Sequence, residues 1–413
     1  MANKRILIIS DYERIVPAFM QTLIRYGVEM FDHIYYITPP IPEQYSKTIS
    51  YDNLTIRTWS NAERLRQYFR GILSPLRFSF WKELSKGRLS FGAIKNIGQL
   101  YFCSDGFLGL IDRYINNALN NNNEVFVLAT WMQVDAFVAA RLKKKYPNIK
   151  SYALAHSGEV MADRNPYLHQ CFHEFKHQYL DTTYFISQKV LDGYYQAMDD
   201  CNIKSRYNSR IKVRYLGSIK NNNMINPDST GDYFELLSCS RIDANKRLDT
   251  IISALKKWNG IPIRWTHIGT GVLENEVKAL ADELMKINPK VKVQFTGRID
   301  NSDVIRYYAE KHVDLFLNVS KSEGLPISIM EAMSYGIPCA ATDVGGTSEI
   351  VNQTNGYILN SDFTDSDLID VLNNYISLPS REKKEMRVAA MNTWYTKFNA
   401  ETNAKALFNE WFN

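Results

Sequence analysis

Two glutamates within residues 314–350 have the residue type and spacing to act on a ligand. Glu323 lies in a polar turn after a short apolar run, and Glu331 lies eight residues later in a mostly apolar stretch. A carboxylate near the start of a helix can simply complement the helix dipole, which would account for Glu323 alone. It does not account for Glu331, because a carboxylate in apolar surroundings needs a partner such as a sugar hydroxyl or a base.

The pattern around these glutamates predicts the elements that position them. Residues 315–319 are typical of a buried strand, and Pro326–Tyr335 predict a helix that ends at Gly336. A second strand is expected at 337–342, and another helix begins near Thr347. Both loops would lie at the carboxyl ends of parallel strands, where open α/β sheets bind ligands, and both precede helix N-termini that attract phosphate.

Two cations follow another predicted strand, Phe234–Ser238. Arg241 and Lys246 lie on the loop that leaves this strand, before a predicted helix. Positive side chains at such a position suit a diphosphate. The alternative interpretation is ordinary surface charge beside Asp243 and Asp249.

The spacing of Glu323 and Glu331, with Gly-Leu-Pro after the first and Gly-Ile-Pro after the helix, resembles the retaining glycosyltransferases of the GT-B fold, family 4 (glycosyl transferases group 1). The resemblance covers about residues 231–360 most specifically. It implies an α/β protein of two Rossmann-like, doubly wound parallel-sheet domains that face each other across a cleft. It also implies that Arg241 and Lys246 contact the pyrophosphate of a nucleotide-sugar and stabilise its charge during catalysis.

The same resemblance implies the other site residues. Glu323 would orient the sugar, Glu331 would accept hydrogen bonds from the ribose, and His156 would match the family's histidine near the donor sugar. The remaining donor-binding positions would be the turns and backbone segments at Gly324, Leu325, Pro326, Arg298, Ile299, Gly269 and Gly271. The implied reaction is a metal-independent, hexosyltransferase-like transfer with retention, needing no cofactor, from a nucleotide-sugar with UDP favoured over GDP.

Other histidines and aspartates leave alternatives open. His156 can instead be a loop histidine that makes one backbone hydrogen bond. His169, His173 and His177 fall on one helical face and two of them could hold zinc, although the reaction that the resemblance implies needs no metal. The pair Asp365 and Asp367 mimics a D-x-D metal motif, and helix capping explains it better.

A chain of 413 residues suits two domains, and its first half alternates strand and helix as a doubly wound sheet does. We expect an acceptor-side domain at 1–217 and a nucleotide-sugar domain at 218–392, with the polar segment Gly217–Asp232 as linker. A terminal helix, about 393–413, would cross back onto the first domain. The family's glycine-rich turn after the first strand, which faces the acceptor, is replaced here by Asp11-Tyr12-Glu13.

The composition indicates which classes of binding partner to expect. A formal net charge of +5 is mildly basic, and no nucleic-acid motif is present, so nucleic acid is not expected. Scattered cysteines and the lack of a long apolar run predict a cytoplasmic protein. Residues 64–95 mix basic and aromatic side chains, which favours an element lying on anionic lipid at the inner face of the membrane. An ordinary solvated helix with an apolar core face is the alternative.

The expected acceptor is therefore a glycan or a lipid-linked sugar, as in bacterial surface polysaccharide or glycoconjugate synthesis. Two other functions remain open from the sequence. One is a nucleotide-sugar 2-epimerase on the same fold, which also uses carboxylates. The other is a catalytically inactive sugar-nucleotide-binding partner of another transferase.

Overall fold

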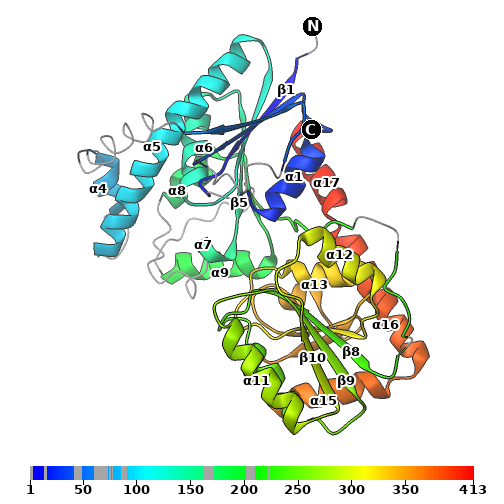
Figure 1. Cartoon of the computed structure of the whole chain (residues 1–413). Helices are drawn as coiled ribbons and strands as arrows, with labels where there is room; N and C mark the ends of the chain where they lie inside the picture. The colour runs from blue at the N-terminus through cyan, green and yellow to red at the C-terminus, as the bar shows by residue number, and fades with distance from the viewer. Residues whose placement is uncertain are drawn as a thin grey trace. The chain divides into compact units, whose positions relative to one another are not determined.

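The computed structural model describes residues 3–13, 16–40, 49–59, 73, 76, 78–84, 91–160, 172–200, 210–220, 224–229 and 231–413. Most of the predicted lipid-facing segment, 64–95, lies outside these residues. The chain divides into two compact units, one of Met1–Leu216 with Glu401–Asn413 and one of Gly217–Ala400 (Figure 1). The first unit is therefore completed by the far end of the chain.

The first unit is built on a seven-stranded sheet whose order is β3-β2-β1-β4-β5-β6-β7, with every pair parallel. Its strands are mostly apolar runs because helices cover both faces of the sheet. The strand order reverses between β1 and β4. The strands are β1 (Arg5–Ser10), β2 (His33–Thr38), β3 (Leu54–Thr58), β4 (Glu124–Ala129), β5 (Lys150–Ala155), β6 (Thr182–Phe185) and β7 (Ile211–Val213).

Helices α1 and α17 lie on one side of this sheet, and α5, α6 and α8 lie on the other (Figure 1). The Trp411 ring of α17 stacks on Tyr152 at 4.2 Å, and its Nε1 donates to the hydroxyl of Tyr184 at 3.1 Å. The last helix thereby completes the apolar core over β4, β5 and β6. The helices are α1 (Ala18–Gly27), α4 (Phe78–Leu84), α5 (Phe91–Asn120), α6 (Val134–Lys145), α7 (Ser157–Val160), α8 (His173–Tyr179), α9 (Gln188–Asp200) and α17 (Ala400–Phe412).

The second unit is a six-stranded sheet of order β10-β9-β8-β11-β12-β13, again with parallel pairs throughout. From β8 the chain builds outward through β9 and β10, then returns to place β11 on the other side of β8. The strands are β8 (Phe234–Cys239), β9 (Ile263–Ile268), β10 (Val291–Phe295), β11 (Leu315–Asn318), β12 (Cys339–Thr342) and β13 (Gly356–Leu359).

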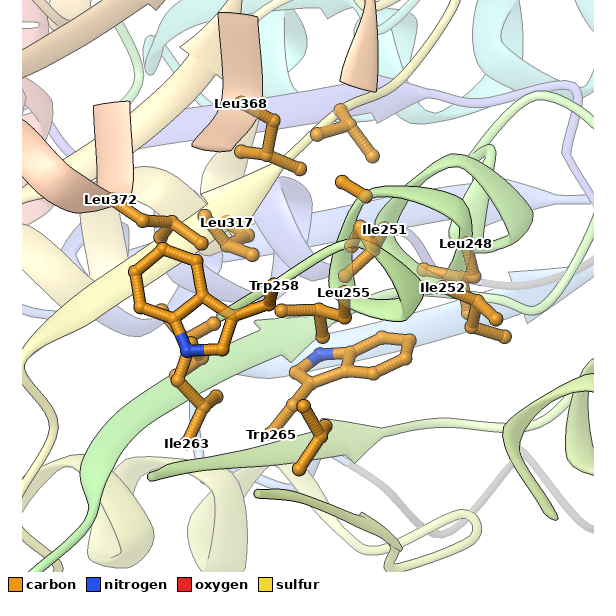
Figure 2. Close-up of a cluster of buried hydrophobic side chains, with 14 of the residues drawn as sticks. Leu248, Ile251, Ile252, Leu255, Trp258, Ile263, Trp265, Leu317, Leu368 and Leu372 are labelled. Carbon is orange, nitrogen blue, oxygen red and sulfur yellow. The ribbon is translucent and has the colours of Figure 1, made fainter. Parts of the chain in front are cut away.

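One face of the second sheet packs against α10, α11 and α15. Figure 2 shows Trp258 and Trp265 in this core, surrounded by leucines and isoleucines of the sheet and of α10 and α15. The helices of the unit are α10 (Leu248–Lys256), α11 (Glu274–Ile287), α12 (Asn301–Glu310), α13 (Ile327–Ser334), α14 (Thr347–Ile350), α15 (Asp365–Ser377) and α16 (Ser380–Thr393), followed by the π-helical turn η3 (Trp394–Phe398).

The two doubly wound parallel sheets confirm the predicted fold class. One detail differs from the sequence predictions. Within the predicted linker, Asn226 is buried, and its amide donates to the carbonyls of Tyr308 and Lys311, at 2.7 Å each. This part of the segment is anchored in the second unit.

Across the portion of the chain that the structure describes, none of the helices is both long enough and apolar enough to cross a bilayer.

Candidate functional site

The strand order of the second sheet brings the predicted cations and the first glutamate to one edge. Strands β8 and β11 pair directly at the point where the order reverses. The loop after β8 carries Arg241 and Lys246, and the loop after β11 carries Glu323. Open α/β sheets bind ligands at such a reversal, outside the carboxyl ends of the strands.

Lys246 and Glu323 form a close ion pair at this edge. The Lys246 Nζ donates to Glu323 Oε1 at 2.6 Å, and the two side chains are only 17% and 12% exposed. The Asn318 amide also donates to the same carboxylate oxygen, at 3.4 Å. Since water is largely excluded, the attraction is stronger than that of a surface pair. The carboxylate holds the ammonium at the sheet edge, where it can meet an anion.

Arg241 is placed differently. Its side chain is 83% exposed and forms an ion pair with Asp243, at 3.4 Å. An exposed pair of this kind contributes little free energy, so the guanidinium can leave it for a stronger anion. The structure therefore puts Arg241 on the loop after β8, as expected from the sequence, without fixing the direction of its side chain.

Two residues that the sequence analysis missed hold the loops together. Asn245 donates through its amide to Ser322 O at 2.9 Å, and its own carbonyl accepts from Lys321 N at 2.7 Å. Arg247, with a φ of 49°, donates from Nε to Val319 O at 2.7 Å. The partners of Asn245 and Arg247 are backbone atoms more than seventy residues away in the sequence. The only sequence signal for these two contacts is therefore that both residues are neighbours of Lys246.

The third loop, between β12 and α14, packs tightly against the loop that carries Glu323. Gly345 has a φ of +55°, and a Cβ atom there would lie 1.8 Å from Glu323 O. The next residue, Gly346, donates its N–H to Gly324 O at 2.6 Å. Glycine is required at 345 both by the backbone conformation and by this close approach.

Glu331 lies inside α13 and is the most perturbed carboxyl of this edge. Its Oε1 accepts a hydrogen bond from the Asn301 amide at 3.0 Å. Burial raises its pKa to about 7, and the Asn301 hydrogen bond offsets part of that rise. A carboxyl in this state gains from further donors, such as a pair of hydroxyl groups. Asn301 was not predicted, because an asparagine at the start of a helix is usually explained by capping.

The remaining predicted donor-binding positions fall on neighbouring loops of the same edge. Gly269, which follows β9 with a φ of +138°, donates its N–H to Gly297 O at 3.0 Å, just before Arg298 and Ile299. A Cβ at Gly269 or Gly271 would lie about 2 Å from a carbonyl of the β8 loop. Leu325 is partly exposed. Pro326 is the residue immediately before α13, so the helix begins one residue later than predicted.

His156 belongs to the first unit, directly after β5. Its ring lies 4.6 Å from those of both Phe19 and Trp131, and burial lowers its pKa to about 4. The ring also makes a hydrogen bond with the backbone of Thr130. The structure thus contains the backbone hydrogen bond expected if His156 is an ordinary loop histidine. A role toward the donor sugar stays a prediction.

In the described part of the chain, the side chains of both metal alternatives have other structural roles. His173 Nδ1 and His177 Nε2 both contact the hydroxyl of Tyr194, and His169 lies outside the described residues. Asp367 forms a capping box with Thr364 at the start of α15, which confirms the capping interpretation. Within the described ranges, no group of three or more His, Cys, Asp or Glu side chains is arranged to hold a metal ion.

Comparison with known proteins finds a family model that resembles most of the second unit. Residues 220–392 match the model of the family "Glycosyl transferases group 1". A segment is 29% identical over 130 residues to a UDP-N-acetylglucosamine–peptide N-acetylglucosaminyltransferase GtfA subunit of Streptococcus agalactiae, covering 30% of this chain and 24% of that protein. Another is 28% identical over 131 residues to the amylovoran biosynthesis glycosyltransferase AmsK of Erwinia amylovora, covering 30% and 31%. The chain thus spans about a quarter to a third of these relatives.

Solved structures resemble the whole chain in fold. Anabaena Alr3699/HepE in complex with UDP matches with a TM-score of 0.66 at 15% identity, covering 98% of this chain and 99% of that one. Sucrose-phosphate synthase of Thermosynechococcus elongatus matches with a TM-score of 0.68 at 14% identity, covering 99% of both chains. With two Rossmann-like units of the GT-B fold, and with the family match over residues 220–392, the comparisons support a group 1 glycosyltransferase.

Proposed function

We propose that this chain is a retaining glycosyltransferase that moves a sugar from a nucleotide-sugar, with a UDP-sugar favoured, to a glycan or lipid-linked acceptor. The proposed setting is the synthesis of a bacterial surface polysaccharide. The observation that carries the proposal is the Lys246–Glu323 pair, 2.6 Å apart at the β8/β11 reversal. Side by side, a cation and a carboxylate suit the two parts of a sugar diphosphate, the phosphate and the sugar hydroxyls.

The comparisons add support from outside the chain. AmsK is named as an amylovoran biosynthesis glycosyltransferase, and a Bacillus subtilis relative is named as a putative teichuronic acid biosynthesis glycosyltransferase. HepE structures contain UDP, UDP with glucose, or UDP-glucose. A UDP-sugar donor and a polysaccharide product agree with these names.

In the proposed reaction, the bond between the anomeric carbon and the diphosphate oxygen breaks, and its electron pair stays on the phosphate. Lys246 and Arg241 stabilise the charge that grows there, so they assist the transition state more than the bound donor. The acceptor oxygen bonds to the anomeric carbon on the face that the diphosphate leaves. Because the new bond forms on that same face, the anomeric configuration is preserved. The proton of the acceptor hydroxyl passes to the departing phosphate.

Glu331 and Glu323 position the donor in this scheme. Glu331 accepts hydrogen bonds from the ribose hydroxyls, which replace part of the solvation that burial removes from its carboxylate. Glu323, fixed by Lys246, accepts from hydroxyls of the transferred sugar. Gly324 lets that sugar approach the backbone before α13, since no side chain intervenes.

Slow donor hydrolysis tests the proposal without knowledge of the acceptor. Purified protein is incubated separately with UDP-glucose, UDP-galactose, UDP-N-acetylglucosamine and GDP-mannose, and nucleotide release is measured. We expect release of UDP from at least one donor, and a free sugar whose first-formed anomer, followed by proton NMR, is that of the donor.

Other outcomes assign other functions. Conversion of a donor to its 2-epimer would indicate the epimerase, since an epimerised sugar that stays on the nucleotide requires no transfer. Tight UDP binding without turnover of any donor would indicate the inactive binding partner. Release of the opposite anomer would overturn retention while leaving transfer in place.

A further inference from the structure

The first unit carries a tryptophan that is fixed at its own strand reversal. Trp131 lies directly after Thr130 in the loop between β4 and α6, and β4 pairs with β1 where the strand order reverses. Its indole Nε1 donates to Asp11 Oδ1 at 3.1 Å. Asp11, just beyond β1, is buried and also accepts from the Tyr36 hydroxyl and from Glu13 N. A buried carboxylate with three donors is a rigid acceptor that sets the orientation of the indole.

The backbone that follows this tryptophan is also held in place, by side chains of α7 and α8. The carboxylate of Glu159 accepts from Met132 N at 3.0 Å and from Gln133 N at 3.2 Å. The ammonium of Lys176 donates to Met132 O at 2.9 Å. These contacts preorganise the loop, as a binding site requires.

Three rings meet at this loop. His156 lies between Phe19 and Trp131, at 4.6 Å from each, and Phe19 meets Trp131 edge-on at 5.9 Å. The Phe19 and Trp131 side chains are partly exposed, whereas His156 is only 8% exposed. The result is a small aromatic surface at the carboxyl edge of the sheet, with an imidazole in its floor.

The imidazole has one buried nitrogen without a partner. Within the described residues, His156 Nε2 makes no hydrogen bond, and neither does Thr130 Oγ1. The Thr130 N–H already donates to Ser10 O at 3.0 Å, so His156 must contact the Thr130 carbonyl, through its other ring nitrogen. Because a carbonyl only accepts, the ring proton lies on that nitrogen and Nε2 carries a lone pair. Buried polar atoms of this kind are rare in proteins and call for a donor.

We propose that Trp131, Phe19 and His156 form a subsite for a neutral pyranose ring of the acceptor, in place of the contact with the donor sugar that the resemblance implies for His156. The apolar face of the sugar lies on the exposed aromatic surface, and one sugar hydroxyl donates to His156 Nε2. Aromatic walls with a few fixed polar atoms are the usual composition of small-molecule sites. A neutral ligand fits because the charged groups beside the rings, Asp11, Glu159 and Lys176, are already engaged in hydrogen bonds. Asp11 is the positioning residue of the subsite.

This inference rests on the proposed function, since a sugar acceptor presupposes glycosyl transfer. Its test uses a different signal. Full-length protein is labelled with 6-fluorotryptophan, and the fluorine NMR resonances of its seven tryptophans are recorded. Methyl glucoside, methyl galactoside and methyl mannoside are titrated as pyranose probes, with sorbitol as an acyclic control and uridine as a nucleoside control.

We expect at least one pyranoside to shift the Trp131 resonance and to leave those of Trp258 and Trp265, in the core of the second unit, unmoved. Substitution His156→Phe keeps a ring and removes the lone pair. It should lower the affinity for that pyranoside roughly threefold to tenfold, which corresponds to the loss of one hydrogen bond. The Trp131 resonance is assigned with Trp131→Phe, or by elimination after substitution of the other six if that variant does not fold.

Three results would overturn the subsite. They are a Trp131 resonance that no pyranoside moves, a shift caused by uridine alone, and unchanged affinity in folded His156→Phe. Nucleotide release from UDP-sugars reports on the proposed function separately. If nucleotide is released but no pyranoside shifts the Trp131 resonance, only the proposed subsite is wrong. A shifted Trp131 without release from any donor removes the transferase assignment and leaves a sugar-binding unit.

Discussion

Among single residues, the cations of the second unit make the most direct prediction. Lys246→Ala or Arg241→Ala should lower turnover by about a hundredfold or more, since each removes one stabiliser of the charge on the leaving diphosphate. Nucleotide release from the preferred donor is the measurement. The matched controls are Arg381→Ala, whose side chain is 88% exposed like that of Arg241, and Lys278→Ala, whose partner is Glu274 one helical turn away. Normal turnover in both site variants would remove the proposed mechanism.

Glu331 predicts how donor binding depends on pH. Its carboxyl has a pKa of about 7 in the folded, ligand-free protein, and it must be ionised to accept from both ribose hydroxyls. UDP affinity should therefore fall as the pH decreases through 7, and binding at pH 6 should release a proton. Calorimetry in two buffers of different ionisation enthalpy measures that release. Asn301→Ala removes a donor that lowers the pKa, so the midpoint should move to higher pH.

The same shift has a consequence for stability. A carboxyl whose pKa is raised on folding binds its proton more tightly in the folded state, so its contribution is favourable at low pH and is lost as the pH rises through 7. Glu331→Gln should thus be more stable than the parent at pH 8, by up to about 2–3 kcal/mol, and nearly equal at pH 4. Denaturant unfolding at both pH values checks the sign. Equal differences at the two pH values would contradict it.

At the scale of elements, the packing of the β12–α14 loop on the Glu323 loop makes the next prediction. Gly345→Ala combines a left-handed backbone with a Cβ placed 1.8 Å from Glu323 O, so the Glu323 loop must move. We expect a loss of at least about 1–3 kcal/mol of stability and weaker UDP binding. Gly231→Ala, also in the second unit, is the control because no atom lies within 4 Å of its added Cβ. Unchanged UDP affinity in Gly345→Ala would show that this loop does not shape the site.

The elements were largely predictable and their mutual contacts were not. The buried strands predicted at 315–319 and at Phe234–Ser238 appear within one residue of those bounds, because parallel strands covered on both faces are continuous apolar runs. The roles of Arg247 and Asn301 were missed, because their partners are distant in sequence and become neighbours only when the sheet forms. The loop that contains Gly345 was predicted between the strand at 337–342 and the helix near Thr347, but the carbonyl that makes glycine obligatory there belongs to another element.

For the whole molecule, metal independence is the first prediction. Turnover should persist in excess chelator, because Lys246 and Arg241 take the place of a divalent ion at the diphosphate. Donor hydrolysis with and without EDTA is the measurement. Loss of activity that a divalent ion restores would show that a metal takes part, and residues such as His169, outside the described part, would have to be considered.

The second prediction for the whole molecule concerns lipid. The segment 64–95 should bind vesicles rich in anionic lipid in a salt-sensitive way, with up to about 1 kcal/mol for each basic residue near the surface. Replacing Arg70, Arg77 and Lys82 together with Ser should reduce sedimentation with such vesicles and spare donor hydrolysis. Replacing Lys286, Lys292 and Arg381 with Ser, three exposed residues of the second unit, is the control. Negligible sedimentation under every condition would favour the ordinary helix and an acceptor free in solution.

The return of α17 to the first unit also sets an order of events during synthesis. The core over β4, β5 and β6 lacks Phe408 and Trp411 until the ribosome has made the whole second unit. At about 5–20 residues per second, that interval is on the order of ten seconds or longer. The second unit is continuous in sequence and can fold as soon as it emerges. We therefore expect the later-made unit to fold first, while the earlier one waits with aromatic core residues uncovered and depends on chaperones.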